Sequence, residues 1–197
     1  MRYNVAPMSR GPMAMTVRIE LVPIGVVRSP YKERSEAPRQ GWLRPDVLCE
    51  VVVFEPYTRA LKDVETFSHI IIIYYCHKAR PWHPLITTPW DTKPHGLFAT
   101  RSPDRPNPLG LCVAKLVERR GNILVVRGLD ALDGSPVLDI KPYLPAVDAF
   151  PDASMGWLKG RLDLSVHQAY KMRGVNMAGD VRRRAEPEGV QGREGVC

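Results

Sequence analysis

The sequence predicts a mainly β protein in which a sheet closes on itself. Short segments rich in Val, Ile and Leu are separated by turn signals, a pattern typical of closed all-β sheets. These segments are RIELVPIGVVRS (18–29), VLCEVVVFE (47–55), HIIIIYYC (69–76), LCVAKLVER (111–119), NILVVRGL (122–129) and PVLDIKP (136–142). RGN at 120–122 predicts a hairpin, and Asp133–Gly134 predicts a tight turn before the last strand.

Short helices are expected around this sheet. Apolar residues recur near the helical period in YTRALKDVETF, residues 57–67. A second helix is expected over 153–173, although this range contains Gly156 and Gly160, which disfavour a helix.

The 197 residues fit one domain with tails. We expect a barrel domain over 18–173. Residues 1–17 contain several methionines with Gly and Pro between them, and are expected to form a flexible leader. Residues 174–197 have few large apolar side chains and are expected to be disordered.

Composition narrows the class of protein. The four cysteines show no CxxC spacing, which favours reduced thiols in the cytoplasm over a disulfide framework. The apolar run 70–76 is too short to span a membrane, so we expect a soluble, cytoplasmic protein. The net charge of +7 fits a polyanionic partner such as nucleic acid, and fits equally well a basic surface without a dedicated partner.

Metal and common nucleotide sites are not predicted. His69 and His77 share a face of one expected strand but would lie about 26 Å apart. Cys76, His77 and His83 match no zinc spacing, and we expect no metal. The chain has neither GxGxxG after a strand nor GxxxxGK[ST], which excludes the usual Rossmann and P-loop fingerprints.

The loop FATRSPDRPNPLG (98–110) predicts an anion-binding site. Its prolines restrict the backbone and favour extended neighbours, so the loop displays Arg101, Arg105 and Asn107 in a pre-organised way. The guanidinium fork of arginine suits carboxylates and phosphates. The alternative is a stiffened connector with solvated arginines.

The segment 130–143 offers a second wall of polar groups. On an extended strand Asp139, Lys141 and Tyr143 project to one side, where a carboxylate, an ammonium and a phenol could line a site. An ordinary surface ion pair explains the first two residues equally well.

Four stretches together resemble the TsaA-like family, whose characterised members are tRNA methyltransferases called TrmO. They are IGVVRSPYKERSEAPRQG, FSHIIIIYYCH, HGLFATRSPDRPNPLGL and LDALDGSPVLDIKPYLP, which follow one another from about residue 24 to 152. The resemblance implies a single-sheeted antiparallel β-barrel that binds S-adenosylmethionine without a Rossmann fold, as a homodimer. It also implies methylation of N6 of threonylcarbamoyl-adenosine 37 in the anticodon loop of threonine tRNA.

The resemblance also assigns cofactor contacts by position. These are Pro38, Arg39, Gln40, His77, Lys78, Arg101, Leu111, Arg127, Gly128, Leu129 and Asp130. We hypothesise that Arg101 or Arg39 holds the methionine carboxylate and that Asp130 and backbone groups hold adenosine. Lys78, Cys112 and Asp104 depart from the family pattern. Asp104 either pairs with Arg105 or weakens phosphate attraction there.

Methylation of a delocalised N6 requires a group that attracts its proton. Asp139 is the expected base, with Tyr143 or Asn107 as its orienting partner. Arg105 or Lys141 is expected to bind the threonyl carboxylate of the substrate. Residues 174–197 are too short to supply the additional C-terminal domain with which some bacterial members bind tRNA. The alternatives are a non-catalytic S-adenosylmethionine- and RNA-binding protein and a small-molecule methyltransferase.

Overall fold

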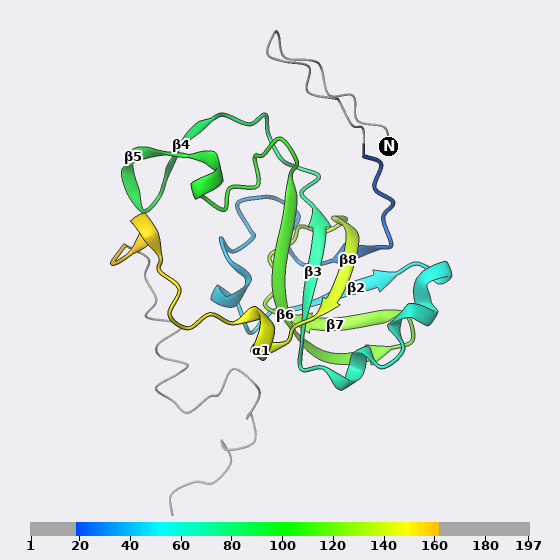
Figure 1. The fold of residues 1–197 in the computed structure, drawn as a ribbon. Coiled ribbons are helices and arrows are strands. Elements are labelled where there is room, and N and C mark those ends of the chain that lie inside the picture. The colour runs from blue at the N-terminus through cyan, green and yellow to red at the C-terminus, as the bar shows by residue number, and fades with distance from the viewer. Residues whose placement is uncertain (1–18, 162–197) are drawn as a thin grey trace, which may run out of the picture.

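The computed structural model describes residues 19–161 (Figure 1). The expected leader (1–17), the expected tail (174–197) and residues 162–173 of the second expected helix lie outside the described residues. Within the described part, none of the helices has the length and apolar character needed to cross a bilayer.

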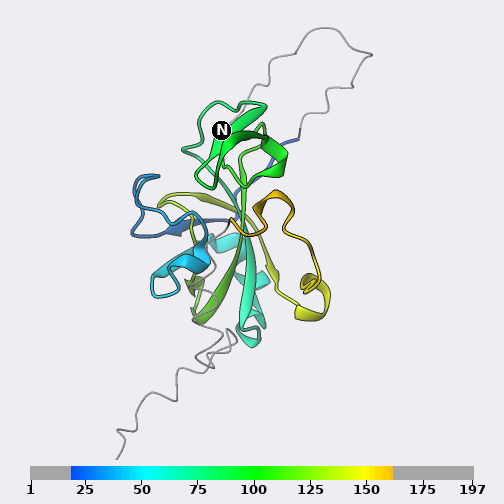
Figure 2. The ribbon, with the colours of Figure 1, turned by 90° about the vertical axis from the view of Figure 1, so that its left-hand side faces the viewer.

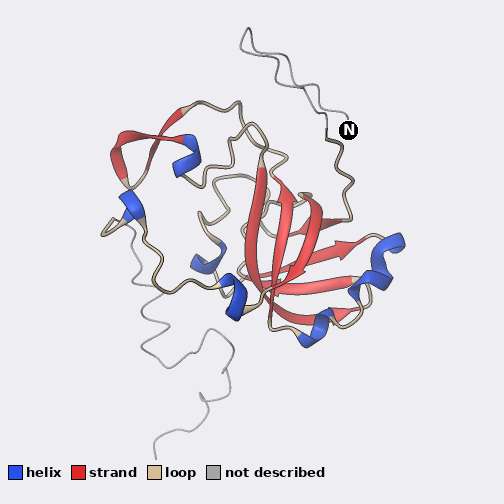
Figure 3. Cartoon of the chain, viewed as in Figure 1, coloured by secondary structure: helices blue, strands red, loops and turns tan. Residues whose placement is uncertain are grey.

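The centre of the fold is a closed antiparallel barrel with strand order β1-β2-β7-β6-β3-β8 (Figures 1 and 3). Its strands are β1 Gly25–Arg28, β2 Leu48–Val53, β3 His69–Tyr75, β6 Leu109–Arg120, β7 Ile123–Arg127 and β8 Pro136–Pro142. Every predicted strand segment therefore contains a strand, and the prediction of a mainly β closed sheet is confirmed. The first strand is shorter than predicted, and residues 19–24 have no regular structure. Pro23 within that range has no backbone N–H to contribute to a ladder.

Alternation along β3 separates the inside of the barrel from the outside. Ile70 and Ile72 are fully buried, whereas Ile71 and Ile73 point outward and are only half-buried. Branched side chains from the other strands complete the core, among them Val51, Leu124 and Val137. One face of each strand therefore forms the core, as the period of two requires.

Both predicted turns are present. Gly121, in the turn between β6 and β7, has φ 62°, and Gly134, which follows Asp133, has φ 78°. Glycine adopts this left-handed backbone with little strain, so each sequence signal matches the geometry that its turn needs.

The predicted helices are much shorter in the structure. The segment 57–67 forms two 3₁₀ helices, η2 Glu55–Leu61 and η3 Val64–Thr66. They are separated by the left-handed Asp63, whose φ of 67° interrupts any continuous helix. The segment 153–161 contains only η5 Gly156–Leu158, and Gly156 and Gly160 both have positive φ. The remaining short elements are η1 Gly41–Leu43, η4 Leu97–Ala99 and α1 Pro145–Asp148.

A two-stranded hairpin outside the barrel was not predicted from the sequence. It consists of β4 Leu85–Thr88 and β5 Asp91–Gly96. Figures 1 and 2 place it at one end of the barrel, away from η2 and η3. The loops that surround this end contain most of the predicted site residues.

Candidate functional site

Two loops with predicted cofactor residues meet at the rim of the barrel. Arg101 Nη1 donates a hydrogen bond of 2.7 Å to Gln40 Oε1. Gln40 Nε2 in turn donates to the carbonyl of Arg39 at 2.6 Å. Over residues 19–161, neither Arg39 nor Arg101 forms an ion pair with an acidic side chain. The rim therefore presents two guanidinium groups that are available to an anion.

The floor beneath these loops is a close backbone contact. A Cβ atom on Gly41 would lie 1.7 Å from the carbonyl oxygen of Gly128, so only glycine fits at position 41. The Cys112 thiol donates to the same carbonyl at 3.1 Å. The predicted segment 127–130 is thereby held against Gly41, which directly follows the PRQ triplet of residues 38–40.

Asp130 lies half-buried at this floor. The Tyr74 hydroxyl donates a hydrogen bond of 2.8 Å to Asp130 Oδ1. Burial raises the pKa of Asp130, and hydrogen bonds from Tyr74, Cys112 and the Gly41 N–H partly offset that rise. At least one carboxylate oxygen of Asp130 therefore accepts a hydrogen bond from within the protein. The expected contact of Asp130 with adenosine stays a prediction.

His77 and Lys78 lie in the loop that follows β3. His77 Nδ1 is 3.2 Å from Ser135 Oγ, and burial together with the neighbouring Lys78 charge lowers the pKa of this imidazole. Lys78 Nζ donates to the Lys32 carbonyl at 2.7 Å and to Glu33 Oε1 at 2.6 Å. Lys78 thus connects the loop after β3 to the loop that precedes the PRQ triplet.

The partner of Asp104 is Arg34, and not Arg105. Arg34 donates to both oxygens of the Asp104 carboxylate, at 2.6 Å and 3.0 Å. Arg105 instead donates to the Thr100 carbonyl at 3.0 Å. Its guanidinium carbon also lies 5.5 Å from the centre of the Phe98 ring. Arg105 therefore stabilises its own loop, a role that the sequence did not indicate.

Asp139 and Lys141 lie on the outer face of the sheet and form an ion pair of 2.7 Å. Asp139 is opposite Ile73 on β3, and Ile73 is opposite Leu111 on β6. The structure therefore brings the expected base and one expected cofactor contact onto the same row of the outer face.

Tyr143 and Asn107 lie toward opposite ends of β3. The Tyr143 N–H donates to the His69 carbonyl at 3.1 Å, at the first residue of β3. The loop with Asn107 meets the opposite end of β3, where the Cys76 N–H donates to the Pro108 carbonyl at 2.8 Å. A strand of this length spans about 20 Å, so within one chain Tyr143 and Asn107 cannot orient the same carboxylate. Asp139 is opposite Ile73, between these two ends, so which of the two residues orients it stays a prediction.

The cysteines of the described region are unpaired. Cys49, Cys76 and Cys112 are free thiols, as expected. Burial raises the pKa of Cys49 and Cys76 to about 11, which keeps both protonated at neutral pH. No group of three or more potential metal ligands occurs among the residues that the structure describes.

One neighbour of the rim was missed by sequence reasoning. The guanidinium carbon of Arg39 lies 5.5 Å from the centre of the Trp90 ring. Trp90 belongs to the turn of the β4–β5 hairpin, and its only signal in the sequence is an aromatic residue between a proline and an aspartate.

The chain is similar to known proteins in sequence and in structure. Residues 26–149 match the model of the tRNA-methyltransferase O N-terminal domain. A probable S-adenosyl-L-methionine-binding protein of Pyrococcus abyssi is 44% identical over 161 residues, covering 82% of this chain and 85% of the relative. The tRNA (adenine(37)-N6)-methyltransferase of Escherichia coli is 40% identical over 144 residues, covering 68% of this chain and 61% of the relative.

Some relatives are considerably longer than the matched region. A probable S-adenosyl-L-methionine-binding protein of Archaeoglobus fulgidus is 46% identical, and the match covers 72% of this chain but 38% of that protein. The crystal structure of a TrmO from Pseudomonas aeruginosa is 35% identical with a TM-score of 0.61, covering 72% of this chain and 63% of that one.

Proposed function

Because the chain belongs to the tRNA-methyltransferase O family, we propose that it transfers a methyl group from S-adenosylmethionine to N6 of threonylcarbamoyl-adenosine 37 in a threonine tRNA. The observation that carries the proposal is the rim of the barrel. There Arg39, Gln40 and Arg101 come together from loops about 60 residues apart, over a floor in which Gly41 contacts Gly128.

The residues at the rim fit the cofactor chemically. The guanidinium groups of Arg39 and Arg101 suit the carboxylate of the methionine moiety, because arginine donates parallel hydrogen bonds to carboxylates. Leu111 is 61% exposed and offers apolar contact. When bound, S-adenosylmethionine would supply an electrophilic methyl group.

Asp139 stays the proposed base of the reaction. Lys141 holds its carboxylate at 2.7 Å, and the Ile140 N–H donates to the other oxygen at 2.9 Å. These two contacts fix the orientation of the carboxylate that is proposed to accept the proton from N6. Asn107 or Tyr143 is the proposed orienting partner. The proposed substrate contact of Lys141 is compatible with its position, since its side chain is exposed beside Asp139.

We assign the proposed homodimer to the outer face of β3 and β6. Leu109, Leu111 and Val113 are 42%, 61% and 42% exposed, and lie opposite Tyr75, Ile73 and Ile71. An exposed apolar surface of this kind is typical of an interface. A second copy would shield this surface and would bring its own outer face beside Asp139.

Methyl transfer tests the proposed function. The protein is incubated with methyl-labelled S-adenosylmethionine and tRNA that either carries or lacks the threonylcarbamoyl group. We expect label only in modified threonine tRNA. Arg101→Ala should weaken cofactor affinity at least about tenfold, because it removes charge-assisted hydrogen bonds. Arg59→Ala, which changes an exposed arginine on η2, is the matched control.

Two other results would redirect the assignment. Cofactor binding without label in any tRNA would select a non-catalytic binding protein, the function that the names of the archaeal relatives describe for those proteins. Label in a small molecule and not in tRNA would select the small-molecule alternative.

A further inference from the structure

The β4–β5 hairpin is fixed to the rest of the chain by the segment that follows α1. The Trp157 ring stacks on the His95 ring, with centroids 3.7 Å apart and planes at 14°. Trp157 Nε1 also donates to the Ala99 carbonyl at 2.9 Å. Arg161 forms an ion pair with Asp91, and His95 Nε2 lies 3.1 Å from the same carboxylate. The hairpin is therefore held in place at two positions of β5, Asp91 and His95.

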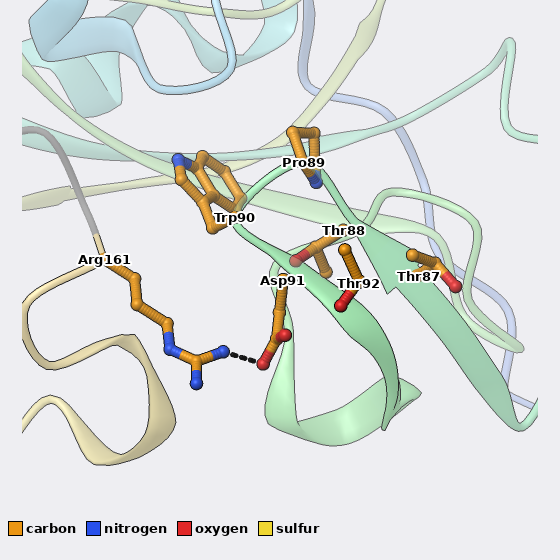
Figure 4. A pocket seen from close by; sticks show the side chains of 7 residues that line it. All are labelled: Thr87, Thr88, Pro89, Trp90, Asp91, Thr92 and Arg161. Carbon is orange, nitrogen blue, oxygen red and sulfur yellow. Dashed lines mark ion pairs between the residues drawn. The ribbon is translucent and has the colours of Figure 1, made fainter.

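The hairpin turn extends to the proposed cofactor site. The half-buried indole of Trp90 projects from the turn, while Asp91 points toward Arg161 (Figure 4). Trp90 lies 5.5 Å from the guanidinium carbon of Arg39, and the next residue, Gln40, accepts a hydrogen bond from Arg101. An aromatic plane is thus positioned directly beside the rim.

A shallow groove adjoins this plane. It is lined by Thr87, Thr88, Pro89, Trp90, Asp91, Thr92 and Arg161 (Figure 4). The hydroxyl of Thr88 is buried and has no hydrogen-bond partner in the described part of the chain, whereas Thr87 and Thr92 are exposed. The Asp91 carboxylate is paired with Arg161, which reduces its repulsion of an anion.

A flat aromatic ring, hydroxyls and guanidinium groups in one place suit a nucleotide. Unpaired bases of RNA loops stack on aromatic side chains, and basic groups bind the neighbouring phosphates. Double-stranded nucleic acid fits poorly, because its bases are stacked on one another and their faces are not accessible.

We propose that Trp90 is a stacking platform for an unpaired base that flanks the methylated base, and that the groove beside it holds the adjoining ribose and phosphate. This inference rests on the proposed function for the identity of the RNA. It adds a substrate-positioning residue outside the barrel and outside the motifs that carry the family resemblance.

The test measures RNA binding separately from methylation. The full chain is titrated with an anticodon stem-loop of threonine tRNA that carries 2-aminopurine at loop positions beside 37, whose fluorescence falls on stacking. Trp90→Ala should weaken binding by about tenfold and abolish the fluorescence change. Trp90→Phe retains a ring and should recover most of both. Phe54→Ala, which removes an exposed aromatic side chain beside η2, is the control and should have no effect.

The outcomes separate this inference from the proposed function. Trp90-dependent stacking without methyl transfer would support the platform and overturn the reaction. Normal methylation with unchanged RNA affinity in Trp90→Ala would overturn the platform alone. Absence of any RNA binding by the wild type would also overturn it. So would a loss of RNA affinity that only follows a parallel loss of S-adenosylmethionine affinity.

Discussion

Arg34 and Asp104 form a bidentate ion pair at the rim, with donor–acceptor distances of 2.6 Å and 3.0 Å. Asp104 Oδ1 also accepts a hydrogen bond of 2.8 Å from the Arg80 N–H. The pair therefore joins the loop before the PRQ triplet, the loop after β3 and the proline-rich loop. Arg39 and Arg101 lie on two of these loops, so their relative position depends on Asp104.

Loss of the Asp104 charge should loosen this junction. Asp104→Asn is expected to lower the free energy of unfolding by about 1–3 kcal/mol, because Arg34 is left partly buried without its charged partner. It should also weaken cofactor binding. Denaturation in urea with and without S-adenosylmethionine measures both effects.

Asp46→Asn is the matched control for this change. Asp46 also accepts two hydrogen bonds from an arginine, Arg44, but both side chains are more than half exposed. Exposed pairs contribute about 0–1 kcal/mol. Equal effects of the two substitutions would show that the Arg34–Asp104 pair has no special role.

Position 41 should tolerate no side chain. Gly41→Ala places Cβ 1.7 Å from the Gly128 carbonyl oxygen, so the PRQ triplet or the segment 127–130 must move. We expect cofactor affinity to fall more than tenfold, as measured by calorimetry, and thermal stability to decrease. Gly96→Ala has open space around the new Cβ and should leave stability unchanged or raise it by about 0.4–1 kcal/mol. Full cofactor affinity in Gly41→Ala would contradict the assigned floor.

The Tyr74–Asp130 hydrogen bond predicts a pH-dependent defect. Burial raises the pKa of Asp130 above its unfolded value, so ionisation of this carboxyl costs stability as pH rises, and the Tyr74 hydroxyl offsets part of that cost. Tyr74→Phe should therefore destabilise the protein by about 1–3 kcal/mol where the carboxyl is ionised, and by less as the pH falls and the carboxyl becomes protonated. Urea denaturation at several pH values gives this profile. A defect that is constant from pH 4 to 7 would exclude the ionised carboxylate as the partner of Tyr74.

The outer face of β6 should control assembly. Leu111→Glu places a charge at the centre of the proposed interface and is expected to convert a dimer into a monomer in light scattering. Val147→Glu changes a residue on α1 that is 63% exposed, compared with 61% for Leu111, and should leave the dimer intact. A monomeric wild-type protein would refute the dimer.

The barrel strands were predictable because the signals for each strand and turn lie within a short stretch of the sequence. In β3 a run of branched residues marks the strand in the sequence, and the glycines at 121 and 134 mark the turns. The β4–β5 hairpin has no such signal. Pro89 and Pro94 interrupt it, and most of its side chains are exposed, so neither alternation nor apolar content distinguishes its strands from a loop.

The site was predictable only in part. The resemblance to the family selected Arg39, Gln40 and Arg101, which the structure places side by side. The partner of Asp104 was not predictable, because Arg34 is 70 residues away and Arg105 is the nearest positive charge in sequence. Strand parity correctly assigned Asp139 and Lys141 to one face. Parity gives no position along the strand axis, however, and therefore could not choose between Tyr143 and Asn107.

The attachment of the β4–β5 hairpin has a consequence for where this domain ends. The match to the family model stops at residue 149, yet Trp157 and Arg161 lie beyond that limit. A fragment ending at Ala149 would retain every barrel strand and lose both of these contacts to the hairpin. Its melting temperature would then be a poor guide to its activity, because an intact barrel could coexist with a displaced Trp90. With the proposed role of Trp90, the functional boundary of the domain is expected to include the segment that holds the hairpin, several residues after the boundary that sequence similarity suggests.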